Sequence, residues 1–338
     1  GGERLVGAVV AVAMVLCFAI VVRGVHVLNV FNKFVTPGLI AVAALLFYGI
    51  FSRHDWPTLA AAAPLEPAEG SLLNYAIAFE YGLGAGFAWW PGIGFLTRNT
   101  DNQRNSLYPQ LLTYGLLMGI VCCTGLFAAL LFRSYDPTEW MLQVGGPFFG
   151  VAALALVAVA NLSASALMIY VAALGLKHVP GLRSVSWPML VGISLLPVLG
   201  YVLYPQVLYD KGGTFLAYNA TIFAPISGVM LVDYLLLRKQ RINVSQVFEE
   251  HPSGQYWFHG GFNWLALGSV AAGQALYLVL FDPVSNDAHP LFQYLTASGP
   301  AVVLPIVLYW VGAKLLLVKR AGGYEAPPSF APIRQPNL

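Results

Sequence analysis

One apolar stretch of the sequence, SLLNYAIAFEYGLGAGFAWWPGIG, combines an acid with residues that interrupt helices. Glu80 is followed at two-residue steps by Gly82, Gly84 and Gly86. An ionisable side chain inside an apolar span is costly, so it is a functional candidate by default. Unwound backbone at membrane depth is tolerated where it lines a cavity, and its free N–H and C=O groups can bind a solute or an ion. We therefore expect a cavity-lining site in which Glu80 carries a proton or binds a substrate N–H and the glycines supply unwound backbone.

The same stretch has a plainer interpretation. Glycines allow helices to pack closely, and Glu80 could be a buried, protonated acid that is hydrogen-bonded to a neighbouring helix. The pair Trp89-Trp90 could stack on a flat ligand, or it could belong to the aromatic belt at a membrane interface. The coincidence of the acid, the glycines and the aromatic residues favours the cavity-lining site.

A second stretch, ALVAVANLSASALMIY, places small and polar residues on two helical faces. Ala160, Ser163 and Ala164 share one face, and Asn161 and Ser165 share another. Amide and hydroxyl oxygens at these positions could bind a polar ligand or an alkali cation. The alternative is ordinary helix packing by small residues with Ser and Asn as hydrogen-bonding partners, and composition alone favours that alternative.

Composition indicates the class of protein that contains these segments. Of the 338 residues, 58% are hydrophobic and 9% are charged, whereas an ordinary soluble domain is about 25% charged. We therefore predict an all-α integral membrane protein. The net charge of +2 is too small to indicate a nucleic-acid partner. No metal-ligand cluster, nucleotide-binding glycine motif or nucleophile elbow occurs in the sequence, so we do not expect an enzyme.

Nine segments are long enough to cross the hydrocarbon core, which needs about 20 apolar residues. Their predicted ranges are 5–24, 28–51, 72–95, 108–132, 147–175, 185–206, 213–237, 262–281 and 294–318. Thirteen Lys and Arg residues fall on one side of these spans and four on the other. Because basic residues concentrate in cytoplasmic loops, this asymmetry predicts a cytoplasmic C-terminus and an N-terminus outside. A chain that begins outside without a signal suggests a preceding piece with an odd number of spans.

The seventh span ends in a specific pattern, FAPISGVMLVDYLLLRKQRI, and the next span begins with HGGFNWLAL. Pro225 and Gly228 precede the Asp233-Tyr234 pair, a basic cluster follows, and Asn263 opens the next span. Over about fifty residues, this order resembles the C-terminal signature of the nucleobase–cation symporter family, type one. The stretches GFLTRNTDNQRNSLYPQLLTYG and NVFNKFVTPGLIAVAALLFYGI are similar to two earlier regions of the family.

The resemblance implies a twelve-helix, leucine-transporter-type fold with two inverted five-helix repeats and two further helices. The nine spans would be helices four to twelve, and the three absent helices are an odd number. Residues 1–51 would then end the first repeat, and residues 72–237 would form the second repeat with a broken first helix. Residues 262–318 would be the two C-terminal helices, and residues 319–338 would be a cytoplasmic tail that we expect to be disordered.

The resemblance also implies a substrate position between helices one, three, six and eight, of which the sixth and eighth are the spans around Gly84 and Ser163. The family's sixth-helix tryptophan falls on a glycine here, so Phe79, Phe87 or Trp89 would replace its ring. The family's helix-eight asparagine falls near Ile169, and either Asn161 or Ser165 would replace it.

The family's sodium site falls on the Ala160 carbonyl, Ser163 and Ala164, so one of its two hydroxyls is absent. Proton coupling through Glu80 is the competing expectation. The resemblance places Asp233 at the cytoplasmic end of the last helix of the second repeat, where we interpret it as structural.

The predicted function is secondary active transport of a nucleobase-like, hydantoin-like or allantoin-like solute, coupled to sodium or protons, in a plasma or inner membrane. The expected partners are this small solute and the lipid bilayer. One alternative is a fragment or split-transporter subunit that needs a second chain supplying three helices, or a non-transporting scaffold. Another alternative is a related transporter of amino acids or thiamine-like solutes.

Overall fold

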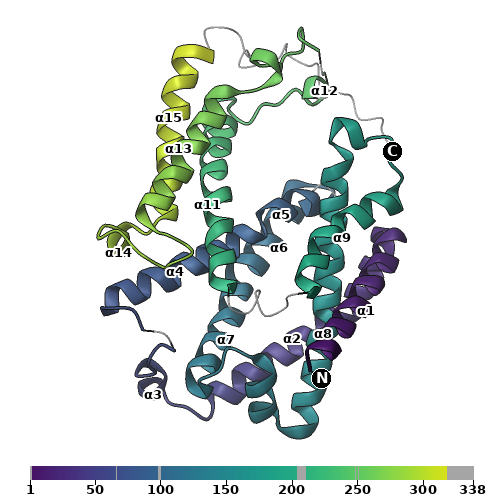
Figure 1. Ribbon diagram of the computed structural model, residues 1–338, viewed down its shortest axis with the longest axis vertical. Helices are drawn as coiled ribbons and strands as arrows, with labels where there is room; N and C mark the ends of the chain where they lie inside the picture. The colour runs from purple at the N-terminus through teal and green to yellow at the C-terminus, as the bar shows by residue number, and fades with distance from the viewer. Residues whose placement is uncertain are drawn as a thin grey trace. The chain divides into compact units, whose positions relative to one another are not determined.

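The protein is described by a computed structural model that is built from helices (Figure 1). The structure describes residues 2–65, 67–97, 100–203, 211–247, 249 and 251–317. The predicted tail, residues 319–338, lies outside these ranges. The chain forms two compact units: unit 1 consists of Gly1–Pro67 and Pro91–Lys211, and unit 2 consists of Ala68–Trp90 and Gly212–Leu338.

Unit 1 contains the first two long helices and the central part of the chain. Its elements are α1 (Gly2–Val22), α2 (Val25–Phe51), α3 (Trp56–Ala60), α5 (Trp90–Thr97), α6 (Gln103–Gln110), the π-helical η1 (Leu111–Leu117), α7 (Met118–Phe132), α8 (Pro137–Lys177), the short 3₁₀ turn η2 (Pro180–Leu182) and α9 (Trp187–Leu203). Helix α8 packs against α1, α2 and α9.

Unit 2 joins one helix from the middle of the sequence to the C-terminal helices. Its elements are α4 (Ser71–Ala88), α11 (Gly212–Leu231), the π-helical η3 (Val232–Leu237), α12 (Val244–Val247), the 3₁₀ turn η4 (His259–Gly261), α13 (Trp264–Leu280), α14 (Phe292–Leu295), α15 (Ser298–Gly312) and the π-helical η5 (Ala313–Leu317). Helices α11, α13 and α15 lie side by side, and α4 packs on α11 (Figure 1).

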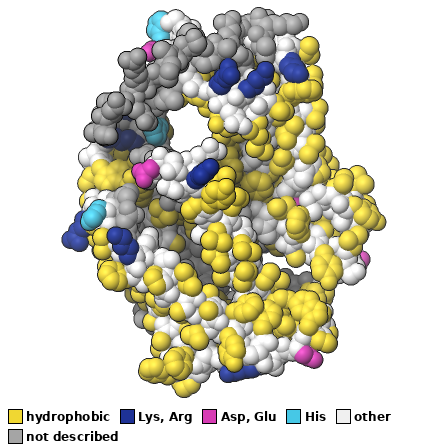
Figure 2. Space-filling model, turned by 180° about the vertical axis from the view of Figure 1, so that it is seen from behind, with side chains coloured by type: hydrophobic (Ala, Val, Ile, Leu, Met, Phe, Trp, Pro, Cys, Tyr) yellow, Lys and Arg dark blue, Asp and Glu magenta, His cyan; other side chains and the backbone are white. Residues whose placement is uncertain are grey.

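The helices have the length and apolar composition of membrane spans. Within the described residues, five are long and apolar enough to cross a membrane: Val30–Phe51, Gln103–Phe132, Pro137–Lys177, Gly212–Leu237 and Ser298–Leu317. Three shorter apolar helices, Gly7–Val22, Trp187–Leu199 and Trp264–Leu280, coincide with other predicted spans. Hydrophobic side chains cover much of the surface in Figure 2, as expected of helices that face lipid.

Helix α8 contains a sharp bend at the point where the sequence predicts a span to begin. Gly146 has φ 68° and ψ −177°, a conformation that a residue with a Cβ rarely adopts, and Pro147 follows it. Gly145 and Gly150 lie close together across this bend, because a Cβ on Gly145 would lie 2.8 Å from the Gly150 nitrogen. The segment before the bend begins at Asp136, whose side chain accepts a hydrogen bond from the Thr138 N–H.

The centre of unit 2 is an apolar cluster that α4, α11 and α13 share with the residues around α14 and α15. Its members include Ala76, Ala217, Ala220, Ala224, Tyr277, Leu280, Phe281, Phe292, Ala297 and Ala301. Alanine dominates where α4, α11 and α15 meet, so the helix backbones come close together. Close backbone approach is the usual way in which membrane helices associate, because there is little hydrophobic drive between helices in lipid.

Candidate functional site

Glu80 is fully buried in unit 2, and its carboxylate lies at the start of α15. Its Oε2 accepts hydrogen bonds from the backbone N–H groups of Ala297 (3.0 Å) and Ser298 (3.1 Å). The Ser298 hydroxyl donates to the other carboxylate oxygen. Three donors thus converge on one carboxylate at a helix N-terminus, where free N–H groups and the helix dipole favour an acceptor with negative charge. Among the described residues Glu80 has no cationic partner, and the Tyr277 side chain of α13 is a further polar neighbour of its carboxyl group.

The three glycines after Glu80 do not form the unwound backbone that the sequence analysis expects. Gly82, Gly84 and Gly86 all lie inside the continuous helix α4, so that expectation is wrong. A Cβ on Gly84 would lie 2.2 Å from the Leu216 carbonyl oxygen of α11. The glycine there permits close helix packing, which was the plainer interpretation, and the helical hydrogen bonds of α4 remain intact.

The helix is interrupted one turn later, between α4 and α5. Trp89 ends α4, and its N–H bonds to the Gly86 carbonyl at 3.2 Å. Pro91 follows within two residues, and a proline can neither donate the helical N–H bond nor tolerate the carbonyl four residues before it. The break therefore falls within the aromatic pair Trp89-Trp90, rather than at Gly82, Gly84 or Gly86.

The aromatic residues near this break have apolar partners in unit 2. The Trp90 ring stacks on Phe223 of α11, with ring centroids 6.0 Å apart and an interplanar angle of 22°. Phe87 packs on the apolar cluster of unit 2 and is partly buried. Phe79 is 61% exposed. Trp90 is one of the rings that could stack on a flat ligand, and it already stacks on a ring of the protein itself.

The polar residues of α8 divide between two faces, as their spacing predicts. Ser163 is buried and donates a hydrogen bond to the side-chain oxygen of Asn32 on α2. Asn161 and Ser165 are exposed, while Ala160 and Ala164 are partly buried. The described residues hold no group of three or more His, Cys, Asp or Glu side chains that could bind a metal ion. A cation at the predicted position would have oxygen ligands only, which is the chemistry that alkali cations prefer.

Asn32 is a residue that the sequence analysis missed. Together with Lys33, Thr36, Pro37 and Ile40 it lines a surface cavity of about 430 Å³ along α2. The signal was present in the sequence, because Asn-Lys inside the apolar run NVFNKFVTPG is as unusual as an acid in a span. The partner of Ser163 on a helix 131 residues away could not be found from the sequence.

The predicted site residues belong to both units. Glu80, the glycines, Phe87 and Trp89 belong to unit 2, whereas Ala160, Asn161, Ser163 and Ser165 belong to unit 1. Within unit 2 the acid is joined to α15, and within unit 1 the α8 serine is joined to α2.

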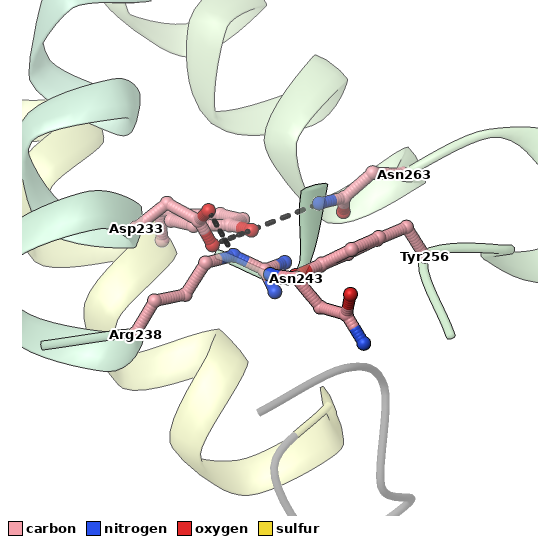
Figure 3. Close-up of polar contacts among 6 residues, drawn as sticks. Asp233, Arg238, Asn243, Tyr256 and Asn263 are labelled. Carbon is pink, nitrogen blue, oxygen red and sulfur yellow. Dashed lines mark hydrogen bonds and ion pairs between the residues drawn. The ribbon is translucent and has the colours of Figure 1, made fainter. Parts of the chain in front are cut away.

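The residues of the C-terminal signature converge on the ends of α11, α13 and α15 (Figure 3). Asp233 Oδ2 accepts a 2.6 Å charge-assisted hydrogen bond from the Arg238 Nε, and the Tyr309 hydroxyl of α15 donates to Asp233 Oδ1 at 3.1 Å. Asn263 Nδ2 donates to the same tyrosine oxygen at 2.9 Å. The Arg238 guanidinium lies 4.7 Å from the centre of the Tyr256 ring. These contacts support the interpretation of Asp233 as a structural residue.

The other signature residues pack the same three helices together. A Cβ on Gly228 would lie 2.4 Å from the Val302 carbonyl oxygen of α15. A Cβ on Gly273 of α13 would lie 2.8 Å from the Pro225 Cβ. Tyr234, the neighbour of Asp233, accepts a backbone hydrogen bond from Gln240 at 2.8 Å. Small residues therefore set the spacing of these helices, and the Asp233 contacts tie their ends together.

The chain matches a known protein family over most of its length. Residues 4–312 match the family described as "Permease for cytosine/purines, uracil, thiamine, allantoin". The chain belongs to this permease family. Membership confirms the resemblance that rests on the Asp233-Tyr234 signature, and the family consists of permeases.

Curated relatives of this permease chain include three transporters. It is 30% identical over 146 residues to the purine-uracil permease NCS1 of Arabidopsis thaliana. The aligned region covers 41% of the chain and 23% of the relative. It is 31% identical over 131 residues to the hydantoin permease of Microbacterium maritypicum, covering 38% and 24%. The allantoin permease of Bacillus subtilis is 30% identical over 78 residues, covering 23% and 16%. The aligned part thus spans about a quarter or less of the length of these relatives.

One solved structure shares the fold. The structure titled "Inward facing conformation of Mhp1" superimposes with a TM-score of 0.62 at 19% identity, covering 93% of this chain and 69% of that chain. This likeness confirms the predicted leucine-transporter-type fold for the permease-family chain. The assignment of the nine helices to family helices four to twelve stays a prediction.

Proposed function

We propose that the protein is a secondary transporter of a small, flat, nitrogen-rich solute of the nucleobase, hydantoin or allantoin type. The observation that carries this proposal is the family match across residues 4–312. The named relatives transport purine and uracil, hydantoin or allantoin, which are planar rings or ureides rich in N–H and C=O groups. Transport would use alternating access, in which one group of helices moves against another around a central site.

The proposed substrate ligands lie near the break between α4 and α5 and on the exposed face of α8. In unit 2, Phe87 and Trp89 are the proposed residues for stacking on a planar solute. In unit 1, Asn161 or Ser165 is the proposed residue for hydrogen-bonding to a polar solute edge. Gly84 now has a different proposed role, because the absence of a Cβ there lets α4 lie close to α11. Gly82 and Gly86 also lie inside α4, where an added Cβ would meet no atom within 4 Å, so no packing role is proposed for them. The exposure of Asn161 and Ser165 in unit 1 supports their assignment.

Two routes for the coupling cation are compatible with the described side chains. The Ala160 carbonyl and the Ser163 hydroxyl, which is joined to Asn32, would contribute to a sodium position. Glu80 is the candidate for a coupled proton, and protonation of its carboxylate would require at least one of the α15 donors to withdraw. The excess of basic residues on one side of the spans supports a cytoplasmic C-terminus in a cell membrane.

Ligand-induced stabilisation of the purified chain in detergent tests the proposal. A ligand that binds the folded state raises the melting temperature by mass action. We expect a shift with at least one of uracil, cytosine, hydantoin or allantoin, and a change in that shift when sodium is removed or the pH is moved from 7.5 to 5.5. Amino acids and thiamine serve as comparison ligands. A shift with these alone would contradict the proposed substrate class.

A further inference from the structure

A second cavity lies in unit 2, where the loop before α13 meets the end of α15. It has a volume of about 540 Å³, and aromatic and aliphatic side chains make up most of its wall. Trp257, Phe262 and Trp264 contribute rings, and Leu316 and Leu317 contribute aliphatic surface. Phe262 and Trp264 are more than half exposed, although both are large and apolar. An open aromatic cavity at the end of apolar helices is suited to an amphiphilic ligand rather than to a soluble polar one.

The shape of this cavity is fixed by the contacts drawn in Figure 3. Asn263 lines the cavity, and its side chain has two structural partners. Its Oδ1 accepts from the Ala266 N–H at 3.1 Å and so caps α13, while its Nδ2 donates to Tyr309 of α15. Tyr309 in turn donates to Asp233. The wall of the cavity is thereby connected to the ends of α11, α13 and α15 through a continuous chain of hydrogen bonds.

Positive charge surrounds this end of unit 2. Lys239 and Arg241 follow η3 directly, are exposed, and have no ion-pair partner in the part of the chain that the structure describes. Lys314 of η5 is also exposed and lies 3.9 Å from the centre of the Trp310 ring. Lys and Arg side chains gather at the end of unit 2 where α11 and α15 finish (Figure 2). Arg238 does not add to this positive charge, because it forms an ion pair with Asp233.

The turn that presents Lys239 is held in an uncommon conformation. Lys239 (φ 50°) and Gln240 (φ 61°) are both left-handed, which costs free energy for residues with a Cβ. Backbone hydrogen bonds from Arg238 to the Asp233 carbonyl and from Gln240 to the Tyr234 carbonyl, both 2.8 Å, maintain this turn. The chain therefore leaves the helix abruptly, and the basic side chains remain at its end.

We propose that this cavity binds the headgroup region of an acidic phospholipid of the surrounding bilayer. The aromatic and leucine side chains would contact the glycerol and upper acyl-chain region, and Lys239, Arg241 and Lys314 would attract the anionic headgroup. Basic residues at the ends of membrane helices are attracted to an anionic membrane surface. Charge complementarity decides the occupant, because a zwitterionic lipid would gain little from these three cations. The inference rests on the membrane location and is independent of the transported solute.

Occupancy of the cavity should stabilise unit 2. The lipid would contact the cavity wall that includes Asn263, and Asn263 connects α13 to Tyr309 and Asp233. A bound lipid would therefore raise the unfolding temperature of the helices that meet in Figure 3.

The test compares the thermal unfolding of the purified full chain in detergent micelles that contain dioleoyl phosphatidylglycerol or dioleoyl phosphatidylcholine. We expect a rise of several degrees with phosphatidylglycerol and a smaller rise with phosphatidylcholine. The double variant Lys239→Gln with Lys314→Gln should lose at least half of the difference between the two lipids. A matched control, Arg104→Gln with Lys211→Gln, removes the same charge from exposed residues that belong to unit 1 rather than to the basic end of unit 2, and should retain the difference.

A substitution of one aromatic ring tests the contribution of the cavity wall. Trp264→Leu removes an exposed ring of the cavity and should also reduce the response to phosphatidylglycerol without lowering the melting temperature in lipid-free detergent. Equal stabilisation by both lipids, or the same loss in the control variant, would overturn the proposal. Stabilisation by free glycerol phosphate at millimolar concentration would also overturn it in favour of a soluble anion. None of these outcomes depends on whether uracil or allantoin binds.

Discussion

Two acids of unit 2 contact opposite ends of the same helix, and their hydrogen-bond partners differ in kind. Glu80 binds the start of α15 through backbone N–H groups and a hydroxyl, with no cation beside it in the described residues. Asp233 binds Tyr309 near the other end of α15, and Arg238 supplies a positive charge. Two of the three donors to the first acid are backbone N–H groups, whereas the partners of the second acid are all side chains, which can rearrange. The two ends of α15 should therefore respond differently to substitution.

The largest effect is expected at Glu80. Glu80→Ala would leave the N–H groups of Ala297 and Ser298 buried without acceptors, at a cost of about 1–3 kcal/mol for each. We expect a large fall in melting temperature in detergent, measured by circular dichroism. Glu80→Gln keeps one acceptor oxygen and should be less damaging. Glu139→Gln, at an exposed position, is the control. An equal fall in melting temperature in that variant would contradict the specific contribution of Glu80 to stability.

At the other end of α15, Asp233→Asn should be the next most damaging change. Arg238 would remain with its side chain only 6% exposed and without its carboxylate partner. Removing one member of a buried pair costs about 3–5 kcal/mol, and the 25% exposure of Asp233 reduces that figure here. The variant Asp233→Asn with Arg238→Gln should recover part of the loss, because no unpaired charge remains. A double variant that is less stable than Asp233→Asn would contradict this account of the pair.

Between the two ends, the close contact of α11 with α15 can be tested at Gly228. Gly228→Ala would place a Cβ 2.4 Å from the Val302 carbonyl oxygen, so the helices must move apart. Overpacking of this kind costs about 1–3 kcal/mol. Gly125→Ala is the matched control, since Gly125 has no atom within 4 Å of the added Cβ. Equal melting temperatures for both variants would show that the α11–α15 contact is looser than described.

A smaller effect should appear with pH outside the membrane helices. The Val284 backbone N–H, 2.8 Å from the carboxylate, and then the Ser285 hydroxyl lower the pKa of Asp282. A depressed folded pKa means that the contribution to stability is present above the unfolded value of about 3.9 and is lost as the pH falls through the folded value. Melting temperature should therefore decline as the pH drops below about 4, and less so in Asp282→Asn. An unchanged slope in that variant would count against this contribution.

The smallest predicted change is an increase in the stability of the folded protein. Gln240→Gly should raise stability by about 0.5–1 kcal/mol, because glycine adopts φ 61° without the cost that a Cβ imposes. Chemical denaturation in mild detergent would measure it. Gln255→Gly is a suitable comparison, since Gln255 is not left-handed, and it should not be stabilising.

The sequence predicted much of the helical framework for identifiable reasons. Glycine and proline at Gly146-Pro147 mark the bend where the predicted span 147–175 begins. The Asp233-Tyr234 signature led to the family that the comparison confirms. Within the described residues, eight of the nine predicted spans coincide with apolar helices, because apolar composition and length are read directly from the sequence. The ninth, 72–95, is divided between α4 and α5.

The details of the site could not be predicted in the same way. Glu80 was recognised as an unusual acid, but its partners Ala297 and Ser298 lie more than 200 residues away, and only the packing of α4 brings them together. The glycines were assigned to unwound backbone because sequence spacing does not distinguish a broken helix from a closely packed one. In the folded chain the Leu216 carbonyl lies close to Gly84, and this contact shows that the helix is closely packed there rather than broken.

The central claim is gradient-driven transport of a nucleobase-like or hydantoin-like solute. Its most direct test is uptake of radiolabelled uracil, hydantoin and allantoin into proteoliposomes that contain the purified chain, with an imposed sodium gradient, an imposed pH gradient or neither. The account predicts concentrative uptake of at least one of these solutes under one gradient, and its loss when that gradient is collapsed. Uptake of none of them under either gradient, by protein that remains folded in the same vesicles, would contradict it.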